Sequence, residues 1–411
     1  MDLNATTGPR VTDASKHAMS GRAPSMAWRP ETAAEVADAV RQAGADGLKL
    51  VPWGGGVALS RERAPERYDV ALDLTALKRV TIYDPEDFTI TVECGITLDE
   101  LRSTLAAQKQ ELPLEGAESW GATLGGVLAA NTSGPRRRAL GAPRDRILGA
   151  RFITGDGVLA KTGGRVVKNV AGHAVHRMLV GSRGTLGVFV EASLKLLPQP
   201  PARVAMVWSG EASTLANAER WRDWPRREPA ALTVIGRAIA AKNPVLNGDA
   251  PFTVVAGFEE DAAWVNDCAE FARHSLGASR VKVSDASVPP LWQQLADLEE
   301  MPGVRLTFTT SANTPDAIAF LAGRPAAERL VFHAPCGRLH MWPDAGEAVE
   351  LVRELAGRGF ALLESRGMGP AAPGQQPRVD ALLGSVRAAL DPTGTLALGA
   401  PFVGKEPPGA G

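Results

Sequence analysis

Residues 123–134 read TLGGVLAANTSG, a run of small residues that ends in groups able to form hydrogen bonds. Adjacent glycines let a backbone lie close against a ligand. Thr123, Asn131 and Ser133 offer hydroxyl and amide groups to a diphosphate or a ribityl chain. Tight packing of small residues against the rest of the protein explains the same pattern equally well. The stretch alone predicts a short helix or turn over 123–131 and leaves its purpose open.

Glycine is concentrated around this stretch. Residues 111–190 contain 15 of the 43 glycines in the chain, interspersed with Val, Leu, Ile and Ala. A disordered linker would be polar and charged instead, so this region is expected to fold.

A second glycine cluster, PWGGGVA at 52–58, follows a strand predicted over 48–51. Three consecutive glycines let several N–H groups point at one anion, as in a phosphate nest. We expect a positive φ at Gly55. An ordinary glycine turn is the alternative, and the spacing is neither that of a Rossmann fold nor that of a P-loop.

A third cluster, GTLGVFV at 184–190, leads into a strand predicted over 188–196. A glycine loop that enters a buried strand can press a flat ring, such as an adenine or a flavin edge, against its backbone; a left-handed turn before the strand is the alternative. The glycine turn at 155–157 predicts a β-hairpin. The basic run Arg136–Arg138 is expected to be a solvated loop or a partner surface, and contact with a phosphate is the alternative.

Six blocks occur in an order that resembles the vanillyl-alcohol-oxidase-type (PCMH-type) FAD-binding family. Over about residues 28–200 the resemblance is strongest to the FAD-binding subunits of bacterial glycolate oxidase. The blocks are Pro52–Gly56, Thr123–Arg137, Gly141–Gly149, Lys168–Gly172, Gly181–Val188 and Leu194–Pro198.

The resemblance implies an FAD site with three parts. Relatives that attach FAD covalently use a His where this chain has Gly56, so non-covalent FAD is implied. The implied contacts are Pro52, Trp53, Gly54, Gly55, Gly56, Val57 and Ala58 around the pyrophosphate; Thr123, Gly125, Gly126, Ala130, Asn131, Thr132 and Ser133 along the diphosphate and ribityl chain; and Gly184, Thr185, Leu186, Gly187, Val188 and Phe189 at the adenine or flavin end.

The prolines at 198, 200 and 201 mark a predicted domain boundary. We expect a flexible arm over 1–20, an FAD-binding domain over 21–200 and a cap domain over 201–411. The predicted fold class is α+β: a two-subdomain PCMH-type FAD-binding domain, followed by a cap with an antiparallel sheet covered by helices.

Two histidines, His333 and His340, lie seven apart. The related D-lactate, glycolate and D-2-hydroxyglutarate dehydrogenases bind a metal through two histidines with this spacing, in a motif that also contains Asp and Asn. This chain lacks that Asp and Asn, and the corresponding second motif at Glu364–Gly369 has no His. We therefore expect a degenerate site without a metal. The pair His173 and His176 has no third ligand nearby in the sequence.

The resemblance implies a glycolate oxidase-like 2-hydroxy-acid oxidoreductase, in which hydride passes from the substrate α-carbon to flavin. The alternative is a non-catalytic flavin electron-transfer or scaffold subunit of a multi-subunit oxidase complex. Candidates for binding a substrate carboxylate are Arg177, Lys168 and Arg338, and no catalytic base is assigned.

Charge and cysteine content narrow the possible partners. The net charge of −1 argues against nucleic-acid binding. Cys94, Cys268 and Cys336 are isolated in the sequence, so any iron–sulfur cluster is expected on a partner subunit, beside a catalytic flavoprotein subunit. No signal peptide or apolar span of about 18 residues is predicted. The expected location is cytoplasmic, with attachment to the inner membrane through partners left open.

Overall fold

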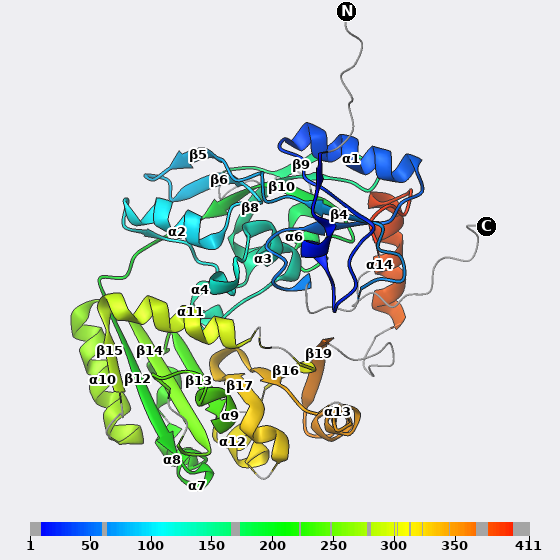
Figure 1. Cartoon of the computed structure of the whole chain (residues 1–411). Helices are drawn as coiled ribbons and strands as arrows, with labels where there is room; N and C mark the ends of the chain where they lie inside the picture. The colour runs from blue at the N-terminus through cyan, green and yellow to red at the C-terminus, as the bar shows by residue number, and fades with distance from the viewer. Residues whose placement is uncertain are drawn as a thin grey trace, which may run out of the picture.

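The computed structural model describes residues 10–397, except 60–63, 166–172, 222, 247–248, 278–280, 300, 302, 312–313, 323, 345 and 367–376. The chain forms two halves, one above the other in Figure 1, and the last helix returns to the first half. The α+β class with antiparallel sheets is confirmed. Among the described residues, no helix has the length and apolar content needed to cross a bilayer.

The first half begins with a four-stranded sheet against which helix α1 (Ala33–Ala45) packs. Thr32 caps α1 by accepting a hydrogen bond from the Glu35 amide, as the Ser/Thr-x-x-Glu pattern predicts. β2, β4 and β3 run parallel, and β1 pairs antiparallel with β2. In sheet order the strands are β1 (Val11–Thr12), β2 (Met26–Trp28), β4 (Val70–Asp73) and β3 (Leu50–Trp53).

The sequence predicts a flexible arm over 1–20, but residues 10–20 are ordered in the structure. Residues 14–17 form a 3₁₀ helix, η1 (Ala14–His17), and both His17 and Met19 are buried. The Tyr68 hydroxyl donates to the His17 carbonyl oxygen at 2.8 Å. Apolar burial and this bond therefore fix residues 10–20 to the first sheet.

A five-stranded antiparallel sheet forms the second layer of this half. It contains the predicted hairpin, since β8 and β9 pair around Gly155–Gly157. The strands in sheet order are β5 (Val80–Asp84), β6 (Thr89–Glu93), β10 (Val188–Lys195), β8 (Ile147–Ile153) and β9 (Leu159–Gly163).

Short elements connect and cover this sheet. Helices α2 and α3 contribute to its core together with β6, β8 and β10. The elements are α2 (Leu98–Ala106), β7 (Gln110–Glu111), η3 (Glu118–Trp120), α3 (Leu124–Ala130), α4 (Arg137–Leu140), α5 (Pro143–Arg146), α6 (Val175–Leu179) and β11 (Leu197–Pro198).

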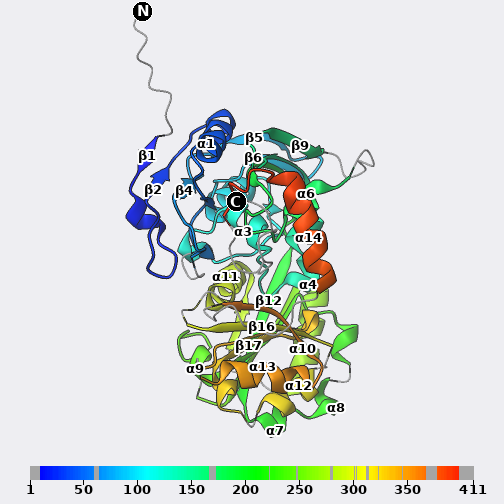
Figure 2. The ribbon, with the colours of Figure 1, turned by 90° about the vertical axis from the view of Figure 1, so that its right-hand side faces the viewer.

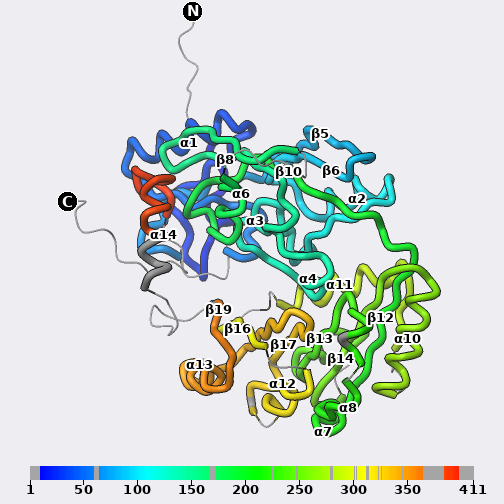
Figure 3. The backbone as a smooth tube through the Cα atoms, turned by 180° about the vertical axis from the view of Figure 1, so that it is seen from behind, coloured from blue at the N-terminus to red at the C-terminus, as the bar shows by residue number. Residues whose placement is uncertain are grey.

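The second half is built on an eight-stranded sheet in which all neighbours run antiparallel. Figure 3 shows from behind how the chain passes from β10 to its first strand, β12. The order is β15 (Val281–Ser284), β12 (Ala202–Gly210), β14 (Phe252–Glu260), β13 (Ala231–Gly236), β17 (Leu330–His333), β18 (Arg338–Met341), β16 (Arg305–Thr310) and β19 (Phe360–Arg366).

Helices cover both faces of this sheet. Alternate residues of a strand point to opposite faces, so each strand contributes to two cores. Val204, Met206 and Trp208 of β12 face one core, whereas Ala205 and Val207 face the other. The first core includes α7 (Ala212–Leu215), α8 (Ala218–Trp221), η4 (Trp224–Arg226), α10 (Ala262–Leu276), α12 (Thr314–Leu321), η6 (Pro325–Arg329) and α13 (Ala348–Ala356). The second includes α9 (Arg237–Ala240) and α11 (Val288–Leu298).

Helix α11 and the last segment of the chain join the two halves. Helix α11 lies on the side of the second sheet that faces the first half and contacts η3 there (Figures 1 and 2). Helix α14 (Pro377–Leu390) stands beside the first half, where Val386 and Leu390 pack against its core. The Leu50 amide donates to the Thr395 carbonyl oxygen at 2.9 Å. The described part of 377–397 thus packs against the first half, although it follows the second in sequence.

Candidate functional site

A large cavity of about 880 Å³ lies in the first half, among the three glycine clusters. This figure counts all the empty space up to the mouth of the cavity, part of which is open to solvent. The sequence-predicted residues that line it are Pro52, Trp53, Gly54, Gly55, Gly56, Val57, Ala58, Thr123, Gly125, Gly126, Ala130, Thr132, Gly184, Gly187 and Phe189.

The loop after β3 forms one wall of the cavity. Among the described residues, the amides of Gly54, Gly55 and Gly56 donate no hydrogen bond to the protein, so they are available to an anion. The positive φ falls at Gly56 (74°) and not at Gly55, which corrects our expectation. Gly55 is required for a different reason: a Cβ there would lie 1.8 Å from the Gly121 carbonyl oxygen.

Helix α3 forms the opposite wall, and its first amides are already used. The Gly125 amide donates to the Cys94 carbonyl oxygen at 2.7 Å, and the Gly126 amide to Thr123 Oγ1 at 3.3 Å. A Cβ on Gly125 would lie 2.9 Å from the same Cys94 oxygen. These two glycines therefore supply space for close packing, and the free donors come from the loop after β3.

The third cluster closes the cavity at Gly184, where a Cβ would lie 2.9 Å from the Pro52 ring. Five predicted residues lie outside the lining. Thr185 donates its hydroxyl proton to the Ser182 carbonyl oxygen at 2.7 Å and is 2% exposed, so it faces the protein. The five are Asn131, Ser133, Thr185, Leu186 and Val188.

Eight lining residues were missed by the sequence analysis, because they are ordinary apolar residues or flank the glycine clusters. They are Leu59, Leu74, Cys94, Ala117, Ala122, Val127, Ala129 and Arg183. Cys94 is the chemically distinctive one, and burial raises the pKa of its thiol well above the ordinary value. It is therefore a neutral thiol in the wall of the cavity.

The basic run Arg136–Arg138 is not a solvated loop as a whole. Arg136 is 3% exposed and donates from Nε to Glu115 Oε1 at 2.8 Å, whereas Arg138 is exposed. Arg137 is half-buried and donates to Ser133 Oγ. The expectation of a solvated loop is wrong for Arg136, because its partner Glu115 lies 21 residues earlier and leaves no local signal. The partner surface stays a prediction.

The other residues that the sequence suggests for substrate or metal binding do not lie together at one site. Arg177 is exposed on α6, and Lys168 lies outside the described residues, as does the block 168–172. The side chains of 364–366 and residues 367–369 also lie outside what the structure describes. His176 is buried, and burial followed by the nearby charge of Arg177 lowers its pKa.

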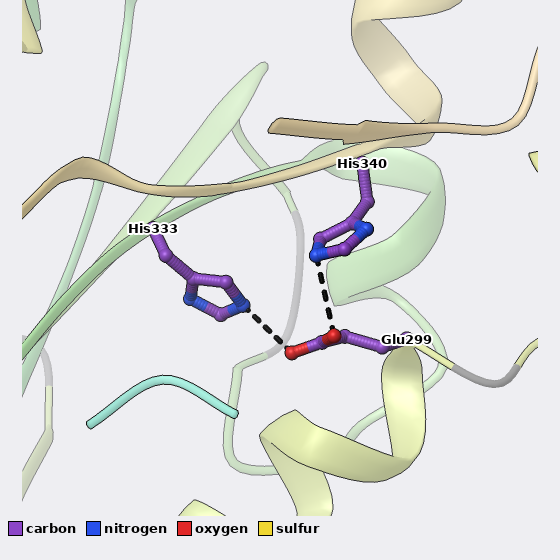
Figure 4. A group of neighbouring side chains, drawn as sticks. All are labelled: Glu299, His333 and His340. Carbon is purple, nitrogen blue, oxygen red and sulfur yellow. Dashed lines mark hydrogen bonds and ion pairs between the residues drawn. The ribbon is translucent and has the colours of Figure 1, made fainter. Parts of the chain in front are cut away.

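His333 and His340 meet around a third residue, Glu299, which the sequence analysis did not identify (Figure 4). His333 Nε2 lies 2.9 Å from Glu299 Oε1, and His340 Nε2 lies 3.2 Å from Glu299 Oε2. The Thr233 and Thr307 hydroxyls lie 2.9 and 3.0 Å from the two Nδ1 atoms. A carboxylate only accepts, so in the neutral imidazoles each Nε2 carries the proton and each Nδ1 accepts from a threonine.

Burial lowers the pKa of His340 to about 4, although the Glu299 carboxylate opposes this shift. Burial also acts on Glu299, but the two imidazoles outweigh it and hold the pKa of that carboxyl well below its ordinary value. At neutral pH the cluster is therefore an ionised carboxylate beside a neutral His340.

The same three side chains are a set of donors that could hold a metal. One ligand atom from each lies within 4.8 Å of the others, and all three residues are buried. Two imidazoles and one carboxylate are typical of transition-metal sites. An ion there would replace the two Nε2 protons, and the threonine hydroxyls would still orient the rings.

Comparisons with known proteins agree with the cavity. Residues 24–163 match the family model described as FAD binding domain. The chain is 42% identical to glycolate oxidase subunit GlcE of Escherichia coli over 139 residues, which cover 33% of this chain and 39% of that protein. It is 32% identical to the D-2-hydroxyglutarate dehydrogenase of Xanthomonas citri pv. viticola over 179 residues, which cover 43% and 38%.

A third relative is the mitochondrial D-lactate dehydrogenase [cytochrome] of Arabidopsis thaliana, with 30% identity over 184 residues that cover 45% and 32%. The matches thus span less than half the length of these curated relatives. Among solved structures, an alkyldihydroxyacetonephosphate synthase matches 91% of this chain and 76% of its own with a TM-score of 0.64 at 18% identity, which shows the shared fold. Residues 24–163, which lie in the first half of the chain, are thus similar to an FAD-binding domain.

Proposed function

Because residues 24–163 match an FAD-binding domain, we propose that this chain is the FAD-binding subunit of a glycolate oxidase-like enzyme that oxidises a 2-hydroxy acid. The named relatives support the substrate class, since they are a glycolate oxidase subunit and dehydrogenases of D-2-hydroxyglutarate and D-lactate. The observation that carries the proposal is the cavity with free amides at Gly54, Gly55 and Gly56 on one wall.

The residues present suit FAD. The free amides of the loop after β3 would bind the diphosphate, and the closely packed glycines of α3 would let the ribityl chain pass. When bound, FAD supplies the acceptor for a hydride from the substrate α-carbon. Gly56 offers no side chain for covalent attachment, so we propose non-covalent binding.

A second candidate is a flavin-bearing electron-transfer or scaffold subunit. It is favoured by the Glu299 cluster, since His333 and His340 are buried and both of their Nε2 atoms face a carboxylate. Neither imidazole is therefore free to take a proton from a substrate hydroxyl. In this role the chain would pass electrons between a catalytic flavoprotein subunit and an iron–sulfur subunit, in a cytoplasmic complex held at the inner membrane by those partners.

Spectroscopy of the purified chain tests the proposal. We expect a yellow protein whose visible flavin band bleaches under anaerobic conditions on addition of glycolate or D-lactate. A flavin that stays oxidised with both acids, while dithionite reduces it, would favour the electron-transfer role. A colourless protein that does not take up added FAD contradicts both. Co-purification from the native host, followed by mass spectrometry and iron analysis, tests the proposed partners.

A further inference from the structure

His17, a buried histidine of η1, contacts the ends of two parallel strands that lead to the large cavity. Its ring lies edge-on to the ring of Trp53, the last residue of β3, with 5.3 Å between the centroids. Its Nε2 lies 3.4 Å from Oδ2 of Asp73, the last residue of β4. Trp53 and Asp73 are register partners, and Trp53 itself lines the cavity. In open α/β sheets, ligands bind beyond the carboxyl ends of parallel strands.

The orientation of the His17 ring is fixed on two sides. Its Nδ1 donates to the Asp13 carbonyl oxygen at 3.0 Å, because a carbonyl oxygen only accepts. On the other side, Asp73 is held by Thr75, whose amide and hydroxyl donate to its Oδ1 at 2.9 and 2.6 Å. Burial acts against the charge of Asp73, but His17 and Thr75 outweigh it and hold the pKa of that carboxyl below its ordinary value. The imidazole is therefore held in one orientation against Trp53.

Trp53 connects this position to the loop after β3. A Cβ on Gly56 would lie 2.8 Å from Cζ2 of Trp53, so the indole packs directly against this glycine. Gly56 has a φ of 74°, and its amide is one of the three that donate no hydrogen bond to the described residues. The Trp53 carbonyl oxygen also accepts the amide of Leu74, another residue that lines the cavity, at 2.8 Å. A shift of the indole would therefore move the free amides of the loop.

We propose that His17 is a positioning residue for the cofactor: its ring holds the Trp53 indole against Gly56, so that the free amides of the loop after β3 stay directed at the FAD diphosphate. This inference rests on the proposed function, which puts the diphosphate at this loop. His17 precedes residues 24–163, the part of the chain that matches the FAD-binding domain. The segment over residues 10–20 would thus belong to the cofactor site, although none of its residues lines the cavity.

The test separates the ring of His17 from its nitrogen atoms. His17→Phe keeps an aromatic ring beside Trp53 and loses both nitrogens, whereas His17→Gln keeps a polar group for Asp73 and loses the ring. FAD is titrated onto the full chain after its flavin has been removed, and the change in flavin fluorescence gives the dissociation constant. We expect His17→Gln to bind FAD about 3- to 10-fold more weakly, in line with the strength of one aromatic pair. His17→Phe should bind FAD like the wild type.

Urea denaturation of the same flavin-free proteins shows whether His17 acts through stability alone. His17→Phe should be the less stable variant, because Asp73 loses a buried partner, so the order of stability is the reverse of the order of FAD affinity. His274→Gln, which replaces an exposed histidine of α10, is the control and should match the wild type in both measurements. Equal FAD affinity in His17→Gln and the wild type, or the same loss in both His17 variants, overturns the positioning role and leaves the proposed function intact. A wild type that takes up no FAD overturns both.

Discussion

The guanidinium of Arg136, from the first half of the chain, lies 3.0 Å from the carboxylate of Glu259, on β14 in the second half. Arg136 also pairs with Glu111 at 2.6 Å and Glu115 at 2.8 Å, so three carboxylates surround one buried cation. Arg203 adds a second positive charge 2.9 Å from Glu111. This ionic cluster links the two halves of the chain.

Replacing Arg136 with Met should destabilise the chain strongly, because three buried carboxylates would lose their shared partner. Removal of one member of a buried ion pair typically costs about 3–5 kcal/mol. We expect a loss of this size in the free energy of unfolding, measured by urea denaturation with intrinsic tryptophan fluorescence. Arg138→Met is the control, since its ion pair with Glu228 is exposed and 3.6 Å long. Equal stability of the two variants would show that the cluster contributes nothing.

The elements with a local pattern could be predicted from the sequence. Thr32 and Thr97 mark the starts of α1 and α2, where each accepts a hydrogen bond from the amide of the Glu three residues on. Thr97 and Glu100 form the full capping box. The glycine clusters predicted most of the cavity lining for a similar reason. Only glycine fits at a position such as Gly55, where a Cβ would overlap a backbone oxygen.

The parts that depend on distant contacts could not be predicted. Glu299 has no motif of its own, and its role follows only from the strands that bring His333 and His340 beside the end of α11. In the sequence Arg136 belongs to a basic run that is typical of a surface, and its pairing with Glu259 follows only from the position of β14 in the fold. The return of the segment around Leu396 to β3 is also long-range, since Leu396 bridges to Leu50 and packs in the core of the first sheet.

Replacing Gly55 with Ala should release FAD. The added Cβ would lie 1.8 Å from the Gly121 carbonyl oxygen, and a backbone atom cannot rotate away as a side chain can. The loop after β3 would therefore move, and its free amides would no longer converge. We expect at least a tenfold rise in the dissociation constant for FAD, which corresponds to about 1.4 kcal/mol, measured from the flavin-to-protein absorbance ratio after dialysis.

The matched control for this variant is Gly384→Ala on helix α14. Gly384 is exposed, and a Cβ added there would have no atom within 4 Å outside its own helical turn. Alanine there should leave the flavin content unchanged and stabilise the helix by up to about 1 kcal/mol. If Gly55→Ala retains FAD as well as this control does, the loop after β3 is not the diphosphate site.

The Glu299 cluster is expected to purify without a stoichiometric metal. His333 Nε2 already donates to Glu299, His340 Nε2 lies 3.2 Å from the same carboxylate, and the described residues provide no fourth donor beside them. Elemental analysis of the protein after gel filtration, without chelator, should give substoichiometric zinc, manganese and iron at this site. One equivalent of any of these in the wild type, lost in His340→Gln, would overturn the expectation and make the cluster a metal site.

The buried His340 should make the protein less stable in mild acid. Its pKa is about 4 when folded and about 6.5 when unfolded. The unfolded chain therefore binds a proton first as the pH falls, and the stability present above pH 6.5 is progressively lost down to pH 4. This shift amounts to about 3 kcal/mol. Urea denaturation across this range should show a shallower pH dependence for His340→Gln than for the wild type. His274→Gln, which removes an exposed histidine of α10, is the control. Identical slopes for His340→Gln and the wild type would mean that His340 titrates alike in both states.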